Sequence, residues 1–198
     1  MHANSRLLFE KYARRYFVSG SHVLEIGPDG SPSTYERIVG DSSITWHTLD
    51  LRADSTLTYR ALSEYDFPID SDRYDIVLSG QVIEHVRQIW VWIRELARVC
   101  KVGGMVATIN PVSWPYHEAP VDCWRAFPEG MRALYEHANL KVVLSHWESL
   151  EATKYARHIP GRSAEWQGRR ERWAYRILGR LGVPVECAYD TITIGEKT

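Results

Sequence analysis

A carboxylate directly before a glycine turn is the first feature of this sequence that could do chemistry. The run Val23–Ile26 is apolar except for Glu25 and is typical of a strand covered on both faces. The next residues, Gly27–Gly30, force a turn. A strand, an acidic residue and a glycine turn that opens into a helix can hold nucleotide-like ligands at the carboxyl ends of parallel strands. An ordinary strand and turn is the alternative.

A second acidic residue, Asp50, lies near the end of the alternating run Ile44–Leu51. It follows the glycine turn by about two dozen residues, close to the separation at which an acidic residue meets ribose hydroxyls in dinucleotide-binding folds. A solvated aspartate that starts a loop is the alternative.

Two histidines are candidates for a general base. His85 follows the apolar run Tyr74–Ser79. Because neutral imidazole titrates near physiological pH, it could take a proton from a hydroxyl nucleophile. A histidine bonded to the backbone at a helix N-terminus is the alternative. His117 is the rival base, and a loop histidine exposed to water is the alternative for it.

The segment Val112–Phe127 carries many aromatic and titratable side chains without periodicity, which suits a functional loop. Within it, Asp122 and Arg125 could orient His117 or contact a substrate. Three aromatic residues could form an apolar wall for a ring or close the end of the sheet: Trp114, Tyr116 and Trp124.

Seven apolar or alternating runs predict the strands that position these residues: 23–26, 44–51, a weak strand within 56–72, 74–79, 105–109, 140–144 and 190–195. Helices are expected at 5–17, 33–39 and 128–138, and over the stripe Ile89, Ile93, Leu96 and Cys100, which Gly103-Gly104 would end. Strands that alternate with helices predict a single α/β domain with a doubly wound, mostly parallel sheet. No crossover helix pattern joins the last two strands, so one of them is expected to be antiparallel.

The segment 149–187 between the last two strands is too long for a hairpin and predicts a helical insert, with a helix over 163–181. Its stretch 154–180 is rich in Lys and Arg, which we interpret first as a solvated helical face and next as a docking surface for an acidic or phosphorylated substrate. We expect the insert to determine specificity or to form a homodimer.

The composition excludes several classes of protein. The chain has 198 residues, a hydrophobic fraction of 44% and a net charge of −1. No run is long enough for a membrane span, and the near-zero charge makes nucleic acid an unlikely partner. The charged N-terminus does not resemble a secretory signal, and the three widely spaced cysteines, Cys100, Cys123 and Cys187, give no metal-ligand spacing. A cytoplasmic protein with reduced thiols is therefore expected.

In their order and spacing these motifs resemble the class I S-adenosylmethionine-dependent methyltransferases, and look closest to the small single-domain methyltransferase-11 type. VLEIGPDG (23–30) resembles the first motif of the family, TLDL (48–51) its second-strand acidic site, and YDIVLSGQVIEHV (74–86) its fourth strand and following turn. RELARVCKVGGMVATINP (94–111) resembles its Gly-Gly turn and fifth strand, and YDTITIG (189–195) its last strand. The resemblance implies a Rossmann-like seven-stranded sheet with the last strand antiparallel. It also implies S-adenosylmethionine as cofactor and S-adenosylhomocysteine as product.

The resemblance further implies which residues hold the cofactor. Glu25 would anchor the loop and the amino group of the ligand, Asp50 would accept both ribose hydroxyls, and Leu51 would pack on adenine. Gly27 would let the backbone approach the ligand, while Gly80 and Gln81 would border the methionine part. The full set of expected contacts is Glu25, Gly27, Pro28, Asp29, Asp50, Leu51, the adenine candidates Ser63, Glu64 and Tyr65, and Gly80 and Gln81.

The glycine turn departs from the family pattern of an acidic residue followed by three alternating glycines. Gly27 is the first glycine, but Asp29 and Ser31 occupy the next two sites, with Gly30 between them. The side chain of Asp29 could hinder the methionine moiety, or it could accept a hydrogen bond from the ammonium of the ligand.

The resulting prediction is methyl transfer to a small-molecule acceptor, with an oxygen atom of a sugar, natural product or cell-envelope precursor preferred. Gln81–His85 resembles the metal-binding turn of RNA 3′-end methyltransferases, but Gln81 replaces an acid and no second histidine stands beside His85. No metal site is therefore predicted, and a metal-assisted RNA methyltransferase is an alternative. A catalytically silent binding module would explain the altered glycine turn. A nicotinamide oxidoreductase lacks the G-x-G-x-x-G run that it would need.

Overall fold

A computed structural model of the chain describes residues 3–114, 116–118, 120–150, 173, 177, 181 and 188–198. In this part of the chain one seven-stranded sheet has the order β3-β2-β1-β4-β5-β7-β6. The strands are β1 (His22–Ile26), β2 (Thr45–Asp50), β3 (Tyr59–Arg60), β4 (Tyr74–Gly80), β5 (Cys100–Pro111), β6 (Leu140–Glu148) and β7 (Asp190–Lys197). The first five are parallel, whereas β7 lies antiparallel between β5 and β6. The predicted α/β fold with an antiparallel last strand is confirmed.

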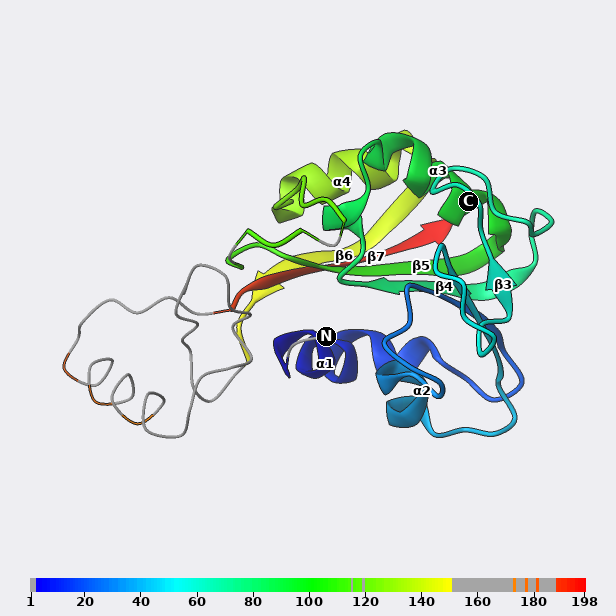
Figure 1. Cartoon of the computed structure of the whole chain (residues 1–198), viewed down its shortest axis with the longest axis horizontal. Helices are drawn as coiled ribbons and strands as arrows, with labels where there is room; N and C mark the ends of the chain where they lie inside the picture. Colours follow the sequence, from blue (N-terminus) through cyan, green and yellow to red (C-terminus); the bar gives the residue numbers. More distant parts are fainter. Residues whose placement is uncertain are drawn as a thin grey trace.

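Helices cover both faces of the sheet (Figure 1). The helices α1 (Ala3–Leu8) and α2 (Thr34–Val39) lie on one face, and α3 (Ile89–Val99) and α4 (Pro128–His137) lie on the other. Successive side chains of a strand point to opposite faces. Along β1, Leu24 accordingly joins the core cluster under α3 and α4, and its neighbour Val23 joins the cluster under α1 and α2. Both faces of the sheet are therefore buried, so a ligand can reach the sheet only at the ends of its strands.

The helix α2 starts at a capping box that fixes the glycine turn before it. The Ser33 side chain accepts a hydrogen bond from the Glu36 amide, and the Glu36 side chain accepts one from the Ser33 amide. The helix ends at Gly40, which has a φ of 62°. The turn after β1 is therefore closed by a helix with both ends satisfied.

The N-terminal helix differs from the prediction of one helix over 5–17. The structure has α1, then a π-helical turn, η1 (Phe9–Ala13), and a 3-10 turn, η2 (Arg14–Tyr16). The changed winding lets Leu8, Phe9 and Ala13 all be buried against the sheet.

The helix α3 ends at Val99. The predicted end at Gly103-Gly104 was therefore wrong. Cys100 is already the first residue of β5. A Cβ at position 104 would lie 2.8 Å from Cys100 Sγ and 2.9 Å from the carbonyl oxygen of Asp75 in β4. Gly104 therefore serves the close packing of the strand and does not cap the helix.

The predicted helix over 163–181 and the proposed role of the insert lie outside the described residues. None of the helices that the structure describes is both long and apolar enough to cross a membrane.

Candidate active site

A cleft of about 320 Å³ opens at the carboxyl ends of β1, β2 and β4. This is where open parallel sheets bind ligands. Among the predicted cofactor contacts, the cleft is lined by Gly27, Pro28, Asp50, Leu51, Ser63, Glu64 and Gln81. It is also lined by Ile26, Leu49, Arg52, Phe67, Val82, His85, Val86, Trp92 and Pro120. Four predicted contacts lie outside this lining: Glu25, Asp29, Tyr65 and Gly80.

Gly27 forms the floor of the cleft in a conformation that favours glycine. Its φ is 67°, and a Cβ on it would lie 2.5 Å from Cγ2 of Val82. Its amide donates a hydrogen bond to the carbonyl oxygen of Leu49 (2.9 Å), which fixes the turn to β2. The turn thus presents bare backbone to the cleft.

Glu25 is buried behind this turn and holds it. Its Oε2 accepts hydrogen bonds from the Ser33 hydroxyl and from Nε1 of Trp46 (2.9 Å). Burial raises the pKa of Glu25 to about 7, although the hydrogen bonds from Ser33 and Trp46 oppose that rise. These contacts join the end of β1 to the start of α2 and to β2.

Asp29 turns away from the cleft and toward the start of α2. Its carboxylate accepts hydrogen bonds from the amide (2.8 Å) and the hydroxyl (2.7 Å) of Thr34. Partial burial opposes ionisation, but these hydrogen bonds outweigh it and lower the pKa of Asp29. The carboxylate is therefore occupied with the helix start, and its bulk does not fill the cleft.

Asp50 ends β2 with its carboxylate in the cleft. Oδ1 accepts a hydrogen bond from the Arg52 amide (3.1 Å), and Oδ2 accepts one from Arg52 Nε (2.7 Å). Arg52 Nη2 also donates to the carbonyl oxygen of Pro28 (2.8 Å), so Arg52 joins the two turns that border the cleft. Each oxygen of Asp50 keeps a lone pair for a further donor.

The adenine candidates separate in the structure. Ser63 and Glu64 line the cleft, as does the nearby ring of Phe67. Tyr65 lies outside the lining, and its hydroxyl oxygen accepts a hydrogen bond from the Gln88 amide (3.3 Å). Ser63 and Glu64 are therefore better placed than Tyr65 to contact a ligand.

The turn after β4 combines a glycine without space for a side chain and a strained glutamine. A Cβ on Gly80 would clash with the ring and hydroxyl of Tyr35. Gln81 has a φ of 60°, which is uncommon for a residue other than glycine. Its Nε2 donates to the Ser5 hydroxyl (2.7 Å) and to Oδ1 of the buried Asp190 (3.2 Å). Contacts to α1 and β7 thus hold the strained conformation beside the cleft.

The cleft suits the nucleoside and side chain of S-adenosylmethionine. The carboxylate of Asp50 matches the two hydroxyl donors of a ribose. The apolar side chains of Leu51, Phe67 and Val82 match the faces of an adenine ring. The backbone at Gly27, which a Cβ would close, leaves space for the chain that carries the sulfonium.

His85 lies in the short 3-10 turn η3 (Ile83–His85) and lines the cleft. Its Nδ1 makes a 2.6 Å hydrogen bond with the carbonyl oxygen of Val121, so Nδ1 carries the proton and Nε2 is the basic nitrogen. The neighbouring Glu84 is 1% exposed, and burial raises its pKa to about 8. The histidine is thus held by Val121 in the loop after β5, next to Pro120, which lines the cleft.

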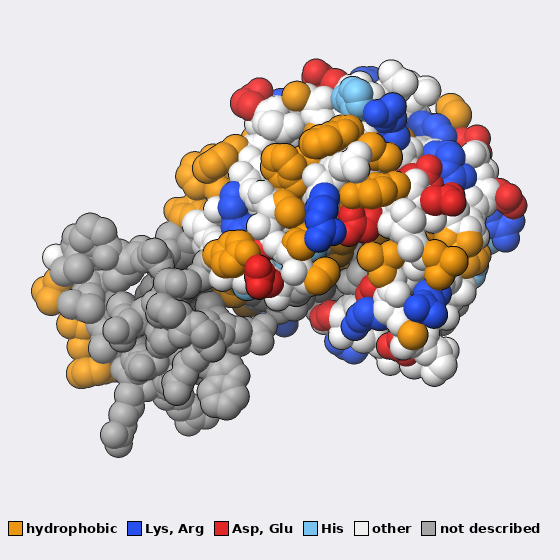
Figure 2. Space-filling view, turned by 45° about the horizontal axis from the view of Figure 1, so that its top comes forward, with side chains coloured by type: hydrophobic (Ala, Val, Ile, Leu, Met, Phe, Trp, Pro, Cys, Tyr) orange, Lys and Arg blue, Asp and Glu red, His pale blue; other side chains and the backbone are white. Residues whose placement is uncertain are grey.

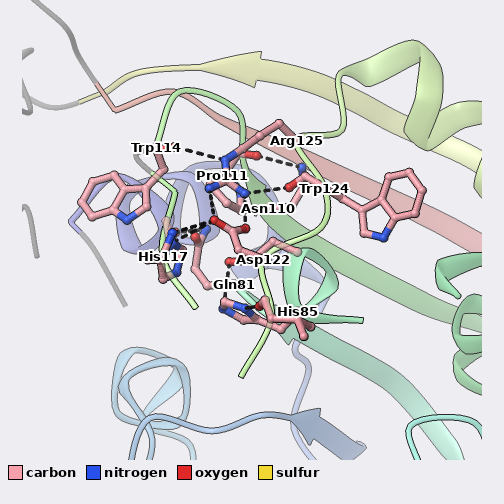
Figure 3. Close-up of polar contacts among 12 residues, drawn as sticks. Gln81, His85, Asn110, Pro111, Trp114, His117, Asp122, Trp124 and Arg125 are labelled. Carbon is pink, nitrogen blue, oxygen red and sulfur yellow. Dashed lines mark hydrogen bonds and ion pairs between the residues drawn. The ribbon is translucent and has the colours of Figure 1, made fainter. Parts of the chain in front are cut away.

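An ion pair organises that loop (Figure 3). Arg125 contacts Asp122 through both Nη1 (2.5 Å) and Nη2 (2.6 Å), and its Nε donates to the carbonyl oxygen of Trp114 (3.1 Å). Oδ2 of Asp122 accepts from the His117 amide (2.8 Å) and lies 3.4 Å from His117 Nδ1. Burial opposes ionisation of Asp122, but the hydrogen bonds from Arg125 and His117 outweigh it and lower the pKa. Asp122 and Arg125 therefore position His117, one of the two roles considered for them.

The three aromatic residues of the loop do not form one wall. The indoles of Trp114 and Trp124 lie on opposite sides of the Asp122–Arg125 pair (Figure 3). Tyr116 is exposed, and its hydroxyl donates to Glu118 (2.7 Å). Trp124 instead lines a shallow groove with Trp90 and Leu134 on the face that bears α3 and α4, where hydrophobic side chains gather (Figure 2).

Sequence reasoning missed several residues of the cleft, among them Arg52, Phe67 and Pro120. Arg52 had a visible signal, since a cation two positions after a candidate ribose carboxylate can pair with it. Phe67 and Pro120 come from irregular segments whose path depends on tertiary contacts, so no local pattern points to them.

The comparisons with known proteins agree with this geometry. Residues 40–108, about a third of the chain, match the family model of the methyltransferase domain. No curated protein matches the chain.

Solved structures share the fold at low identity. A Haloferax volcanii protein in complex with the Trm112 methyltransferase activator is 17% identical, with a TM-score of 0.62 and coverage of 98% of this chain and 93% of that one. An S-adenosylmethionine-dependent methyltransferase from Archaeoglobus fulgidus is 16% identical, with a TM-score of 0.63 and coverage of 97% and 94%. The geranyl diphosphate C-methyltransferase of Streptomyces coelicolor, in complex with Mg²⁺, geranyl diphosphate and S-adenosylhomocysteine, is 13% identical, with a TM-score of 0.58 and coverage of 96% and 79%.

These structural likenesses establish the fold, and residues 40–108 match the methyltransferase domain family. The fold is that of the class I S-adenosylmethionine-dependent methyltransferases, and the cleft suits S-adenosylmethionine as methyl donor and S-adenosylhomocysteine as product.

Proposed function

We propose that the protein transfers the methyl group of S-adenosylmethionine to an oxygen atom of a small-molecule acceptor. The observation that carries this proposal is the placement of His85. It lines the cofactor cleft, and its Nδ1 is held by the Val121 carbonyl, so that Nε2 is the basic nitrogen. An oxygen acceptor must lose its proton for transfer, and a basic nitrogen at this place serves that need.

In this proposal Asp50 accepts the ribose hydroxyls and Leu51 packs on the adenine. Gly27 and Pro28 border the methionine part on one side and Gln81 on the other. All five residues line the same cleft. Glu25 acts through the turn, because its carboxylate holds Ser33 and Trp46. The methyl group then lies toward the His85 end of the cleft, where the acceptor approaches.

Methyl transfer from a sulfonium is an in-line displacement, so the protein acts mainly by holding the reacting atoms in line. The loop that contains Asp122 and Arg125 would confine the acceptor against the cofactor. Its Cys123 amide donates to the Glu84 carbonyl oxygen (2.7 Å), and its Trp124 Nε1 donates to the Val86 carbonyl oxygen (2.8 Å). These bonds fasten the loop to the segment that carries His85, which supports a defined acceptor position.

A small acceptor is supported by the net charge of −1, which gives the protein no overall attraction to nucleic acid. One structural neighbour is a methyltransferase of a small molecule, geranyl diphosphate. That neighbour is a C-methyltransferase, so the acceptor atom is the finer part of the proposal and needs its own test.

The test is a turnover assay with S-adenosylmethionine labelled in its methyl group. Phenols, sugars, carboxylic acids, amines and prenyl diphosphates are offered separately, and NMR of the product identifies the methylated atom. The proposal predicts a methyl ether or methyl ester, and His85→Ala should reduce kcat much more than the affinity for S-adenosylhomocysteine. Exclusive methylation of nitrogen or carbon, or of a macromolecule, would overturn it.

A further inference from the structure

Glu84 is a buried carboxylate that the methyl-transfer site does not explain. Its side chain is 1% exposed. Among the residues that the structure describes, none makes a hydrogen bond to Oε1 or Oε2. Buried polar groups in native proteins are almost always satisfied, and a charged one demands a partner most strongly. A bound cation would meet this demand.

Two histidines lie where such a group would sit. One carboxylate oxygen of Glu84 and one ring nitrogen each of His85 and His117 all lie within 4.8 Å of one another. Oε1 of Glu84 is 3.8 Å from His85 Nε2, and the two imidazole rings meet nearly at right angles with centroids 5.0 Å apart. Ligands about 2.1 Å from one metal ion lie roughly 3–4 Å from each other. A small inward rotation of these side chains therefore brings them to coordination distance.

The surroundings of both histidines are those of metal ligands. His85 donates its Nδ1 proton to the Val121 carbonyl oxygen, which directs Nε2 toward Glu84. His117 Nδ1 lies 3.4 Å from Asp122, whose carboxylate Arg125 holds in place. Metal-binding histidines commonly present one nitrogen to the ion while the other bonds to a carbonyl or carboxylate.

The fold brings the three residues together from two segments far apart in the sequence. Glu84 and His85 follow β4, whereas His117 comes from the loop after β5. The hydrogen bond from the Cys123 amide to the Glu84 carbonyl oxygen fastens one segment to the other. The sequence predicted no metal site because Gln81 replaces an acid and no second histidine stands beside His85. In the fold His117 supplies that histidine, while the acid at position 81 stays absent.

We propose that Glu84, His85 and His117 bind one divalent transition-metal ion beside the cofactor cleft. Two imidazoles and one carboxylate favour Zn²⁺ and its neighbours in the first transition row over Mg²⁺ and Ca²⁺, which prefer oxygen ligands. Three protein ligands leave a coordination position open, as in catalytic metal sites. His85 belongs to both the ion site and the cleft lining, so the open position lies next to the acceptor.

The role of the ion rests on the proposed function, although its binding does not. An acceptor hydroxyl on the open position would lose its proton more readily, and the oxygen would then attack the methyl carbon while the sulfonium leaves as a neutral thioether. The released proton passes to solvent. His85 then acts as a ligand, and the ion replaces the imidazole as the group that activates the acceptor.

The test measures metal binding by the full-length protein without cofactor or acceptor. After removal of metal by a chelator, Zn²⁺ is titrated against a chromogenic chelator, and Co²⁺ is added separately as a spectroscopic probe. The proposal predicts one equivalent of tightly bound Zn²⁺ and visible Co²⁺ bands of the intensity typical of a site with fewer than six ligands. Glu84→Gln, His85→Ala and His117→Ala should each weaken Zn²⁺ binding by about tenfold or more.

His137→Ala is the matched control, because His137 is exposed at the end of α4 and lies outside the cluster. Circular dichroism checks that each variant is folded, and Glu84→Gln preserves the shape of the side chain while it removes the carboxyl group that would bind the ion. Absence of a stoichiometric site in the wild type, or retention of it in all three variants, would overturn the proposal. Zn²⁺ binding without any O-methylation would overturn the proposed function alone, whereas O-methylation by a protein that binds no metal would overturn the metal site alone.

Discussion

Arg52 donates a 2.7 Å hydrogen bond from Nε to Oδ2 of Asp50, the carboxylate that faces the cofactor cleft. The same guanidinium reaches the Pro28 carbonyl oxygen at 2.8 Å, so one side chain spans the turns after β1 and β2. Arg52 is itself 58% exposed, and an exposed ion pair contributes little to stability. Its importance is therefore expected in the orientation of Asp50.

Arg52→Ala should weaken S-adenosylhomocysteine binding by about threefold and leave the thermal unfolding midpoint nearly unchanged, because Asp50 loses its orienting donor. Arg52→Lys is the control, since it keeps the charge but lacks the planar group that reaches both partners. It should bind nearly as weakly as the alanine variant. Tighter binding by Arg52→Ala would mean that Arg52 competes with the ligand.

Gly27→Ala should destabilise the protein by about 2 kcal/mol, because alanine at positive φ is strained and its Cβ would meet Val82. Gly20→Ala separates the two effects: Gly20 has a φ of 81° but nothing within 4 Å of a new Cβ. Urea unfolding measures both variants. Equal losses at the two positions would contradict a specific close approach at Gly27. The same substitution, Gly27→Ala, should cost less stability when it is made in the Val82→Ala variant than in the wild type, because Val82→Ala removes the methyl group that the new Cβ would meet.

Glu25 should make the stability of the protein fall as the pH rises. Its pKa is about 7 in the folded protein and 4.5 in its ordinary state, so folding favours the protonated form. The contribution is fully present below the ordinary pKa and is lost as the pH rises through the folded pKa, by ~3 kcal/mol in all. Glu25→Gln carries no such titration, and the groups common to both proteins cancel. The unfolding free energy of the variant minus that of the wild type should therefore rise between about pH 4.5 and pH 7. Parallel profiles would contradict the raised pKa.

Asp122→Asn should raise the KM for the acceptor about fivefold or more, because Asp122 organises the loop after β5. The affinity for S-adenosylhomocysteine should change less than about twofold, because Asp122 does not line the cofactor cleft. Stability should fall by about 2–4 kcal/mol, because the side chain of Asp122 is 1% exposed and Arg125 loses its partner. Glu129→Gln is the control: Glu129 pairs with Arg132 at the same spacing, but its side chain is 90% exposed. Equal effects of the two substitutions would contradict the loop's role.

The sequence predicted the sheet well because burial on both faces leaves a local mark. The runs around β1, β4 and β5 are largely apolar. The absence of a crossover pattern predicted that one of the last two strands is antiparallel, and the family resemblance implied that it is the last one. The end of α3 was placed too late, since Gly103-Gly104 resembles a helix cap, yet Gly104 is needed for contact between two strands.

The sequence predicted those site residues whose place follows from the end of a single strand. Gly27 and Asp50 are of this kind, and both line the cleft. The association of Glu84 with His117 was not predictable, because it depends on how the loop after β5 folds back onto η3. Nor could the sequence indicate that Asp29 would turn toward Thr34, since its position relative to Gly27 allows either direction.

The most direct test of the cofactor assignment is calorimetric titration of S-adenosylhomocysteine into the wild type, Asp50→Ala and Asp70→Ala, an exposed aspartate outside the cleft. We predict that Asp50→Ala weakens binding by about 10- to 100-fold, because two charge-assisted hydrogen bonds to the ribose are lost. Its unfolding midpoint should be unchanged. Asp70→Ala should bind S-adenosylhomocysteine like the wild type. Unchanged affinity in a folded Asp50→Ala variant would show that the ribose is not held at the end of β2.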